Sequence, residues 1–346
     1  MSRLRLWVAQ NRGFAGACLL LAALWLLYNL LHPKGFSSAL MVQNANESTA
    51  IAFVAMAQTV PVLLGGLDLS VGAVATLANC IASILVNGSP AQMLLGMAAT
   101  LLAGALFGLM NGLVVVYGRI QPIIATLATG AIAIGLALII RPSPGGSVDD
   151  DLSWALTNSA WDFADTYGLA DGGEAWWFRP FANLPVPFIL LALVAIVVWI
   201  PFRRSVTGRT VYAIGSAEGA AYMSGLPIDR AKIAAFTLAG FFAACGGLYL
   251  AIQTSSGNAD VTQAGAYTLN SIAAVVLGGT SLFGGVGGAI ASIVGAFILR
   301  IISFYFRILS IDPLLQPLIE GAVLLAAVSL GAVRTLRVRN RLELFR

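Results

Sequence analysis

Charged residues, histidine and cysteine are scarce in this chain of 346 residues. Asp, Glu, Lys and Arg make up 10% of the sequence, against roughly a quarter in a soluble domain, whereas hydrophobic residues make up 59%. The single histidine is His32, and Cys18, Cys80 and Cys245 lie far apart within apolar runs, where cysteine usually acts as a small packing residue. The sequence therefore argues against a soluble fold, predicts no metal site and offers no nucleophile–base pair for catalysis.

Lysine is scarce as well, since Lys34 and Lys232 are the only two. The segment 278–288 is rich in glycine, like a phosphate-binding loop, but no Lys-Ser or Lys-Thr pair follows it. The chain therefore has no Walker A sequence and is expected to bind no cofactor itself. If ATP drives its activity, ATP and Mg²⁺ must be used by another polypeptide.

Long apolar runs, by contrast, recur along the whole chain. Ten segments resemble membrane spans, each of which needs about 20 apolar residues, and we place them as follows: 14–31, 47–65, 69–86, 91–117, 121–140, 186–202, 230–254, 268–280, 286–308 and 313–333. The second and eighth are weak or short, which suggests that some helices are broken. The composition predicts an all-α, polytopic membrane protein of about ten transmembrane helices, with residues 1–346 forming one transmembrane domain.

The distribution of basic residues predicts how the chain is oriented. Loops rich in Lys and Arg stay in the cytoplasm, and an even number of spans places both basic termini there. With ten spans, most of the 19 basic residues fall on that side: Arg3, Arg5, Arg12, Arg119, Arg203, Arg204, Arg209, Arg230, Lys232, Arg334, Arg337, Arg339, Arg341 and Arg346. They flank apolar runs instead of forming one patch, which favours the bilayer over nucleic acid as partner. No cleavage site follows the first run, so we expect a retained anchor.

The connection 141–185 then lies on the outer side of the membrane and is acidic. Its ionisable residues and tryptophans are Asp149, Asp150, Asp151, Asp162, Asp165, Asp171 and Glu174, Arg141 and Arg179, and Trp154, Trp161, Trp176 and Trp177. The tryptophans either anchor a short amphipathic helix at the membrane surface or form a docking surface for a soluble binding protein.

Polar residues within apolar runs are the candidates for a translocation path, because such residues are costly unless they face a cavity or a partner. The sequence Gly65-Gly66-Leu67-Asp68-Leu69-Ser70-Val71-Gly72 predicts a broken helix in which Asp68 or Ser70 caps the second part. Asp68 either performs only this capping or also contacts a solute. Each of the other candidates either lines a path or forms an interhelical hydrogen bond: Gln58, Ser70, Asn79, Asn111, Gln121, Asn270 and Glu320.

Two further patterns concern packing and the cytoplasmic side. Gly104, Gly108 and Gly112 predict a smooth helix face for close approach of another helix. Within the loop 203–232, Ser216 is a candidate N-cap of a short helix with Glu218 in its first turn. Gly225 could end this helix in a left-handed conformation, before Pro227. Such a helix is either a contact point for a motor subunit or an ordinary interfacial helix.

Four patterns, in this order and spread over about residues 45–330, resemble the ribose/xylose/galactofuranose-type permeases of bacterial ABC importers, a family close to the branched-chain amino-acid permeases. They are Gly65-Gly66-Leu67-Asp68-Leu69-Ser70-Val71-Gly72; Asn111-Gly112-Leu113 with Arg119-Ile120-Gln121-Pro122-Ile123-Ile124-Ala125-Thr126-Leu127; Gly215 through Ala220-Ala221 to Ser224-Gly225; and Gly278-Gly279-Thr280-Ser281 through Gly284-Gly285-Val286-Gly287.

The resemblance implies a permease subunit in the bacterial inner membrane, with 141–185 as a periplasmic loop and 203–230 as a cytoplasmic coupling loop. It implies a second permease subunit, identical or paralogous, two cytoplasmic ATP-binding subunits and a periplasmic solute-binding protein. The residues implied to contact the ATPase are Gly215, Glu218, Ala220, Ala221, Ser224 and Gly225. The stretch 145–180 is longer than the family's usual outer loop.

Two other functions fit parts of the sequence. An ion-coupled secondary carrier could use Asp68 or Glu320 as its coupling carboxylate, although the short helix near 216–225 argues against a stand-alone carrier. A branched-chain amino-acid ABC permease would share the family's fold, and the Asp68 and 278–288 patterns lean towards sugars instead. Pentose, hexose, furanose, polyol and signal molecule all fit the sequence as solutes.

Overall fold

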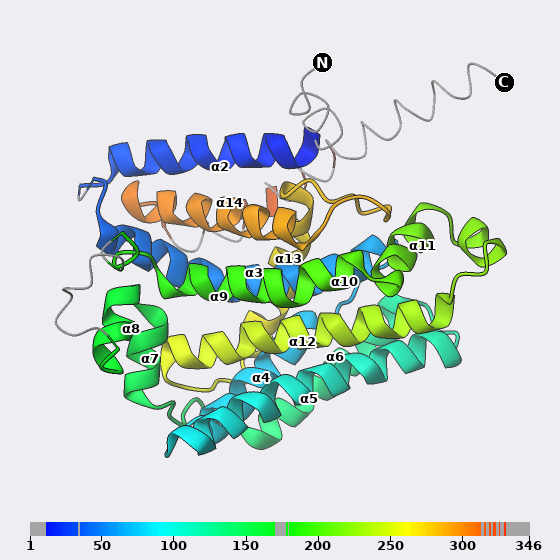
Figure 1. Cartoon of the computed structure of the whole chain (residues 1–346), viewed down its shortest axis with the longest axis horizontal. Coiled ribbons are helices and arrows are strands. Elements are labelled where there is room, and N and C mark those ends of the chain that lie inside the picture. The colour runs from blue at the N-terminus through cyan, green and yellow to red at the C-terminus, as the bar shows by residue number, and fades with distance from the viewer. Residues whose placement is uncertain are drawn as a thin grey trace.

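The computed structural model describes residues 12–33, 35–169, 178, 180–312 and isolated positions between 315 and 329, and these residues form a helical bundle with no β-strand. Figure 1 shows long helices lying side by side with roughly parallel axes. The helices are α2 (Arg12–Leu31), α3 (Ser38–Leu63), α4 (Val71–Leu85), α5 (Pro90–Tyr117), α6 (Pro122–Ile140), α7 (Asp150–Thr157), α8 (Ala160–Thr166), α9 (Val186–Val194), the π-helix η1 (Ala195–Trp199), α10 (Ile200–Arg204), α11 (Val206–Met223), α12 (Ile228–Thr254), α13 (Val261–Leu277) and α14 (Ala289–Ile308).

Within the described part of the chain, six helices are long and apolar enough to cross a membrane: Arg12–Leu31, Pro90–Tyr117, Pro122–Ile140, Val186–Arg204, Ile228–Thr254 and Ala289–Ile308. α4 and α13 are apolar but shorter, with 15 and 17 residues. The prediction of a polytopic, all-helical membrane protein is therefore confirmed, whereas ten spans stays a prediction. Most of the last predicted segment, 313–333, lies outside the described residues.

α3 differs from its prediction in length and continuity. The sequence suggested a weak, possibly broken segment at 47–65, but the structure contains one 26-residue helix that starts at Ser38, where Ser37 accepts the capping bond from Leu40. Hydropathy alone did not predict this start, because the first turns of α3 contain polar residues, including Gln43 and Glu47. From Ser48 to Leu63 every residue is buried, because α12, α13 and α14 pack around this part of α3.

The glycine face of α5 packs against α12, as predicted. A Cβ atom on Gly108 would lie 2.2 Å from the Phe236 carbonyl oxygen, and one on Gly104 would lie 2.6 Å from the Gly240 carbonyl oxygen. Only glycine therefore permits this approach of the two backbones. α12 also packs on α3 and α4, which makes it the central helix of the bundle.

The two ends of the bundle differ in structure (Figure 1). α7 and α8 lie at one end, and α11 projects at the other. The acidic residues of α7 and α8 act partly as helix caps: Asp149 accepts from the Leu152 N–H, and Ser159 and Asp162 form a capping box. Several asparagine, serine and arginine bonds fasten this end to the bundle, among them Arg141 Nε to Ser83 Oγ at 3.1 Å.

Candidate functional site

Two interruptions of the helices carry the sequence patterns that suggested function. The first break, residues 64–70, joins α3 to α4, and the second break, residues 278–288, joins α13 to α14. In the first, the Gly65 N–H bonds to Val62 O at 2.9 Å and the Gly66 N–H bonds to Pro61 O at 3.0 Å, which ends α3. Asp68 is 2% exposed and Ser70 is fully buried, so the predicted broken helix is present inside the bundle.

Asp68 organises the first break. One of its carboxylate oxygens, Oδ1, accepts hydrogen bonds from the Ser70 N–H at 2.8 Å and from the Ser70 hydroxyl at 2.6 Å. The Asn111 side-chain amide on α5 donates to Ser70 Oγ at 2.8 Å. Ser70 is the N-cap residue of α4 but makes no side-chain cap bond; Asp68, two residues earlier, instead accepts from the Ser70 N–H and closes the turn. Contact of Asp68 with a solute stays a prediction.

Two buried side-chain amides have polar atoms without a partner among the described residues. Both side-chain polar atoms of Gln58, and Oδ1 of Asn111, are buried without a hydrogen bond. Gln58 is 0% exposed and lies on α3, less than three turns before the break. A buried polar group without a partner costs about 1–3 kcal/mol, so these amides are suited to a polar partner that enters the bundle from outside the chain.

Asn79, Gln121 and Asn270 are the other path candidates that the structure describes, and they lie on other elements of the bundle. Asn79 donates to Ser256 O at 3.2 Å and accepts from the Asn258 N–H at 2.8 Å, which ties α4 to the connection between α12 and α13. Gln121 is exposed at the N-terminus of α6. Asn270 is half-buried on α13, and Glu320 lies outside the described residues. Hydrogen bonds therefore join Asp68, Ser70 and Asn111, whereas Asn79 bonds to the connection between α12 and α13.

The segment 203–230, which was predicted to be a coupling loop and which we call the coupling segment, is more helical than the sequence suggested. α11 starts already at Val206, with Ser205 as N-cap, and its helical conformation is interrupted at Ala217. Ser216 does not cap the second part as predicted, because its hydroxyl donates to Tyr212 O within the first part. The predicted end is confirmed: Gly225 has φ +72°, and the Leu226 N–H bonds to Ala221 O, as in a Schellman motif.

The short helix 218–223 exposes apolar side chains at its tip. Tyr222 is 72% exposed and Met223 is 84% exposed, while Ala221 is buried against the bundle. Glu218 forms an ion pair with Lys232 of α12 at 2.6 Å, and Ser224 donates its hydroxyl to Ala220 O at 2.8 Å. Contacts within the chain thus hold the start of this helix at Glu218, while Tyr222 and Met223 remain exposed and accessible to a partner.

Close glycine packing joins the coupling segment to both breaks. A Cβ atom on Gly215 would lie 1.9 Å from Leu63 O and 2.4 Å from the Gly285 nitrogen. The Gly285 N–H bonds to Leu63 O at 3.0 Å, and the Tyr212 hydroxyl bonds to Gly287 O at 2.7 Å. Three of the four sequence patterns therefore meet at one point, which we call the glycine junction: Leu63, Gly65, Gly215, Gly284 and Gly285.

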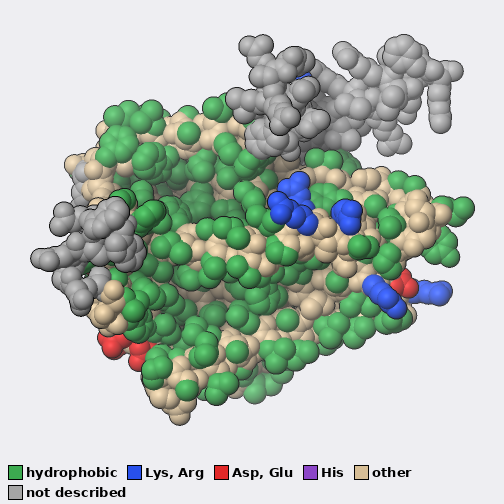
Figure 2. All heavy atoms as spheres, viewed as in Figure 1, with side chains coloured by type: hydrophobic (Ala, Val, Ile, Leu, Met, Phe, Trp, Pro, Cys, Tyr) green, Lys and Arg blue, Asp and Glu red, His purple; other side chains and the backbone are tan. Residues whose placement is uncertain are grey.

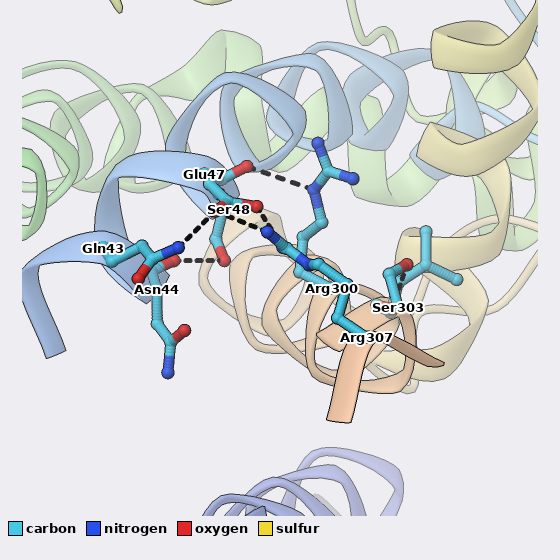
Figure 3. Close-up of polar contacts among 8 residues, drawn as sticks. Gln43, Asn44, Glu47, Ser48, Arg300, Ser303 and Arg307 are labelled. Carbon is cyan, nitrogen blue, oxygen red and sulfur yellow. Dashed lines mark hydrogen bonds and ion pairs between the residues drawn. The ribbon is translucent and has the colours of Figure 1, made fainter. Parts of the chain in front are cut away.

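A charged cluster between α3 and α14 escaped the sequence analysis (Figure 3). Arg307 forms a two-pronged ion pair with Glu47, in which Nη1 donates to Oε1 at 3.0 Å. Arg300 donates from Nε to the Glu47 backbone carbonyl at 3.1 Å, and Gln43 donates to Glu47 Oε1 at 3.1 Å. The signal in the sequence was the spacing of seven between two arginines within one apolar run, which places both on one helix face.

Comparison with known proteins identifies relatives along nearly the whole chain. A family model, described as the permease component of branched-chain amino acid transport systems, matches residues 40–328. The ribose import permease protein RbsC of Haemophilus influenzae is 30% identical over 325 residues, which cover 93% of each chain. RbsC of Bacillus subtilis is 32% identical over 317 residues, or 91% of each chain.

A third relative extends the similarity to another sugar permease. The L-arabinose transport system permease protein AraH of Escherichia coli is 33% identical over 264 residues, or 76% of this chain and 74% of the relative. No solved structure matches the chain at a significant level. The chain belongs to the family of branched-chain amino acid transport system permease components, and within it is similar to permeases of sugar import systems.

Proposed function

We propose that this chain is the membrane-spanning permease subunit of a bacterial ABC importer for a monosaccharide. The observation that carries the proposal is the similarity, over more than nine tenths of the chain, to ribose import permeases from two bacteria. The family description names branched-chain amino acids, but the relatives reported above are named for sugars, as is a D-allose permease. Neither an amino-acid permease nor an ion-coupled carrier is therefore favoured.

The orientation follows from charge at the two ends of the bundle. Figure 2 shows Lys and Arg side chains in the half of the visible face that contains α10 and the start of α12, and Asp and Glu side chains near α7 at the opposite end. By the positive-inside rule, the α11 end faces the cytoplasm and α7 and α8 face the periplasm. Nine helical passes among the described residues and one more at 313–333 would place both termini in the cytoplasm.

Transport requires that the site in the bundle respond to ATP use elsewhere. We infer that cytoplasmic ATPase subunits contact the exposed tip of the short helix, at Tyr222 and Met223. A displacement of this helix acts directly on Leu63 and the first break, because the glycine junction leaves no side chain between the two backbones to absorb it. Asp68, Ser70 and Asn111 lie just beyond this point and would move with it.

The solute path needs polar groups that are not already satisfied. We infer that Gln58 and the Asn111 carbonyl supply them, since these buried atoms lack partners among the described residues. Neutral amides suit a hydroxyl-rich solute, to which they can both donate and accept hydrogen bonds. A second permease subunit would complete the path, and a periplasmic binding protein would deliver the solute to the α7–α8 end.

The first test removes the apolar tip of the coupling segment. Tyr222→Ala combined with Met223→Ala should abolish uptake of the sugar in cells that express the chain with its partner subunits, and should reduce co-purification of the ATPase. Both side chains are exposed, so membrane expression should not change. The matched control is Leu169→Ala, an equally exposed apolar residue at the opposite end, which should keep uptake and the ATPase. Uptake that persists without ATPase and follows a proton or sodium gradient would refute the importer.

A further inference from the structure

A basic pocket lies beside α10, at the end of the bundle that carries α11. It has a volume of about 450 Å³ and is lined by Trp199, Ile200, Arg203, Arg204, Arg209 and Ile290. Three of its six lining residues are arginines, and they come from two consecutive helices. The arginines of α10 directly follow an apolar run long enough to cross a membrane, so the pocket lies where the bilayer meets the cytoplasm in the proposed orientation.

The three guanidinium groups have no carboxylate partner among the described residues, where the ion pairs are Lys232–Glu218 and Arg307–Glu47. Arg203 is nevertheless held in place, because its guanidinium lies 5.8 Å from the centre of the Tyr212 ring. Tyr212 in turn donates its hydroxyl to Gly287 O at 2.7 Å. The positive charge is thus fixed and available for an anion from outside the chain.

The rest of the pocket is apolar and continues onto an apolar surface. Trp199 is fully buried behind the pocket, and Ile290 is 41% exposed at its edge. One turn earlier, Ile196 and Val197 are 61% and 60% exposed on the π-helix. Figure 2 shows hydrophobic side chains along the same face of the bundle, beside the Lys and Arg side chains near α10. An occupant therefore needs an anionic head and an apolar tail.

We propose that this pocket binds an anionic phospholipid, with the headgroup phosphate held by Arg203, Arg204 and Arg209 and an acyl chain lying along Ile196 and Val197. Basic pockets between helices on the cytoplasmic side are suited to such headgroups. A free phosphate would gain nothing from the apolar part of the lining. The site rests on the proposed orientation, since anionic lipid headgroups meet these arginines only at a membrane surface.

Occupancy of the pocket also bears on the coupling segment. Arg203 and Arg204 end α10, Ser205 caps α11, and Arg209 lies in the first turns of α11. A bound headgroup that bridges Arg203 and Arg209 fixes the angle between these helices. Tyr212, which contacts Arg203, is bonded to the second break. The lipid is therefore placed to stabilise the first part of α11, which leads to the short helix 218–223.

The test measures lipid retention by native mass spectrometry on the purified full-length chain, after exchange into neutral phosphatidylcholine with or without phosphatidylglycerol. Wild type should retain phosphatidylglycerol in preference to phosphatidylcholine. Each single change, Arg203→Gln, Arg204→Gln or Arg209→Gln, should weaken retention about fivefold, since one arginine contributes ~1 kcal/mol towards an anionic headgroup. Arg119→Gln is the matched control, because Arg119 is exposed at the same end of the bundle and outside the pocket.

A triple Lys variant at the three positions keeps the charge, and with it the membrane topology, and should retain most of the binding. Equal retention of the two lipids, or no loss in the three Gln variants, would overturn the proposal. Inorganic phosphate that displaces phosphatidylglycerol completely would assign the pocket to a soluble anion instead. If the three Gln variants no longer co-purify the ATPase from cells but retain the lipid as wild type does, the arginines would be assigned to that partner instead. None of these readouts requires uptake, so lipid binding without sugar transport would refute only the proposed function.

Discussion

The two breaks in the bundle are stabilised by different kinds of residues. The first break is partly buried, and side chains satisfy its backbone: Asp68 binds the Ser70 N–H, and Thr126 Oγ1 accepts from the Leu69 N–H at 2.9 Å. The second break reaches the surface, where Phe283 and Val286 are 65% and 61% exposed. Its shape depends on glycines with positive φ, among them Gly284 at +86° and Gly287 at +121°.

This difference follows from where each break lies. Inside an apolar bundle, a backbone N–H that leaves its helix can be satisfied only by protein or enclosed solvent, so polar side chains are required. At the surface, water can also satisfy the backbone, and the main constraint becomes steric, although Thr280 Oγ1 still accepts from the Gly288 N–H at 3.2 Å. The two breaks meet at the glycine junction, where Gly65 of the first break lies against Gly284 of the second.

The largest effect is expected from filling the junction. Gly284→Ala places a Cβ atom 2.8 Å from both Gly215 Cα and the Gly65 nitrogen, at a positive φ. Because these are backbone atoms, no side-chain rotation relieves the overlap, and we expect a loss of roughly 3 kcal/mol in stability together with loss of uptake. Thermal unfolding in nanodiscs and uptake in cells measure the two.

Gly168→Ala separates overlap from conformational strain. Gly168 also has a positive φ, +62°, but nothing lies within 4 Å of its Cβ position. We expect a drop of only ~1 kcal/mol and normal uptake. If both variants lose the same stability, backbone strain alone explains the effect, and close packing at the junction is not what specifies these glycines.

A smaller effect is expected at the first break. Asp68→Ala leaves the buried Ser70 N–H and hydroxyl without their acceptor, at a cost of about 2 kcal/mol. Asp68→Asn keeps an oxygen at the Oδ1 position and should retain most of the stability and uptake. Normal stability with lost uptake in Asp68→Asn would show that the carboxylate contacts the solute in addition to closing the turn.

These expectations show how far the sequence predicted the site. The pattern Gly-Gly-x-Asp-x-Ser located the first break correctly, because glycine pairs and capping residues act locally. It could not show that Gly215 and Gly284 meet, since that contact depends on long-range packing. Ser216 was wrongly predicted as a cap because α11 begins ten residues earlier, and a helix already passing through Ser216 offers its hydroxyl the Tyr212 carbonyl instead.

Dependence on long-range contacts also explains why the start of α3 and the Glu47–Arg307 ion pair were not predicted. The predicted segment began at residue 47 and missed the polar first turns of α3, where Arg307 and Arg300 of α14 bind Glu47. The partner Arg307 is 260 residues away from Glu47 along the chain, so the sequence alone could not reveal this pair.

The smallest effect on stability is expected at Gln58, where a substitution separates a role in folding from a role in solute binding. Gln58→Leu replaces a buried amide without partners by an apolar side chain of similar size, and should leave stability unchanged or raise it by ~1 kcal/mol. Uptake should fall, because the solute loses an amide that can both donate and accept. Gln43→Leu, on the exposed start of the same helix, is the control and should keep uptake. If Gln58→Leu transports normally, Gln58 does not contact the solute. The polar groups near the first break then serve only to stabilise the fold, and the path lies elsewhere in the bundle.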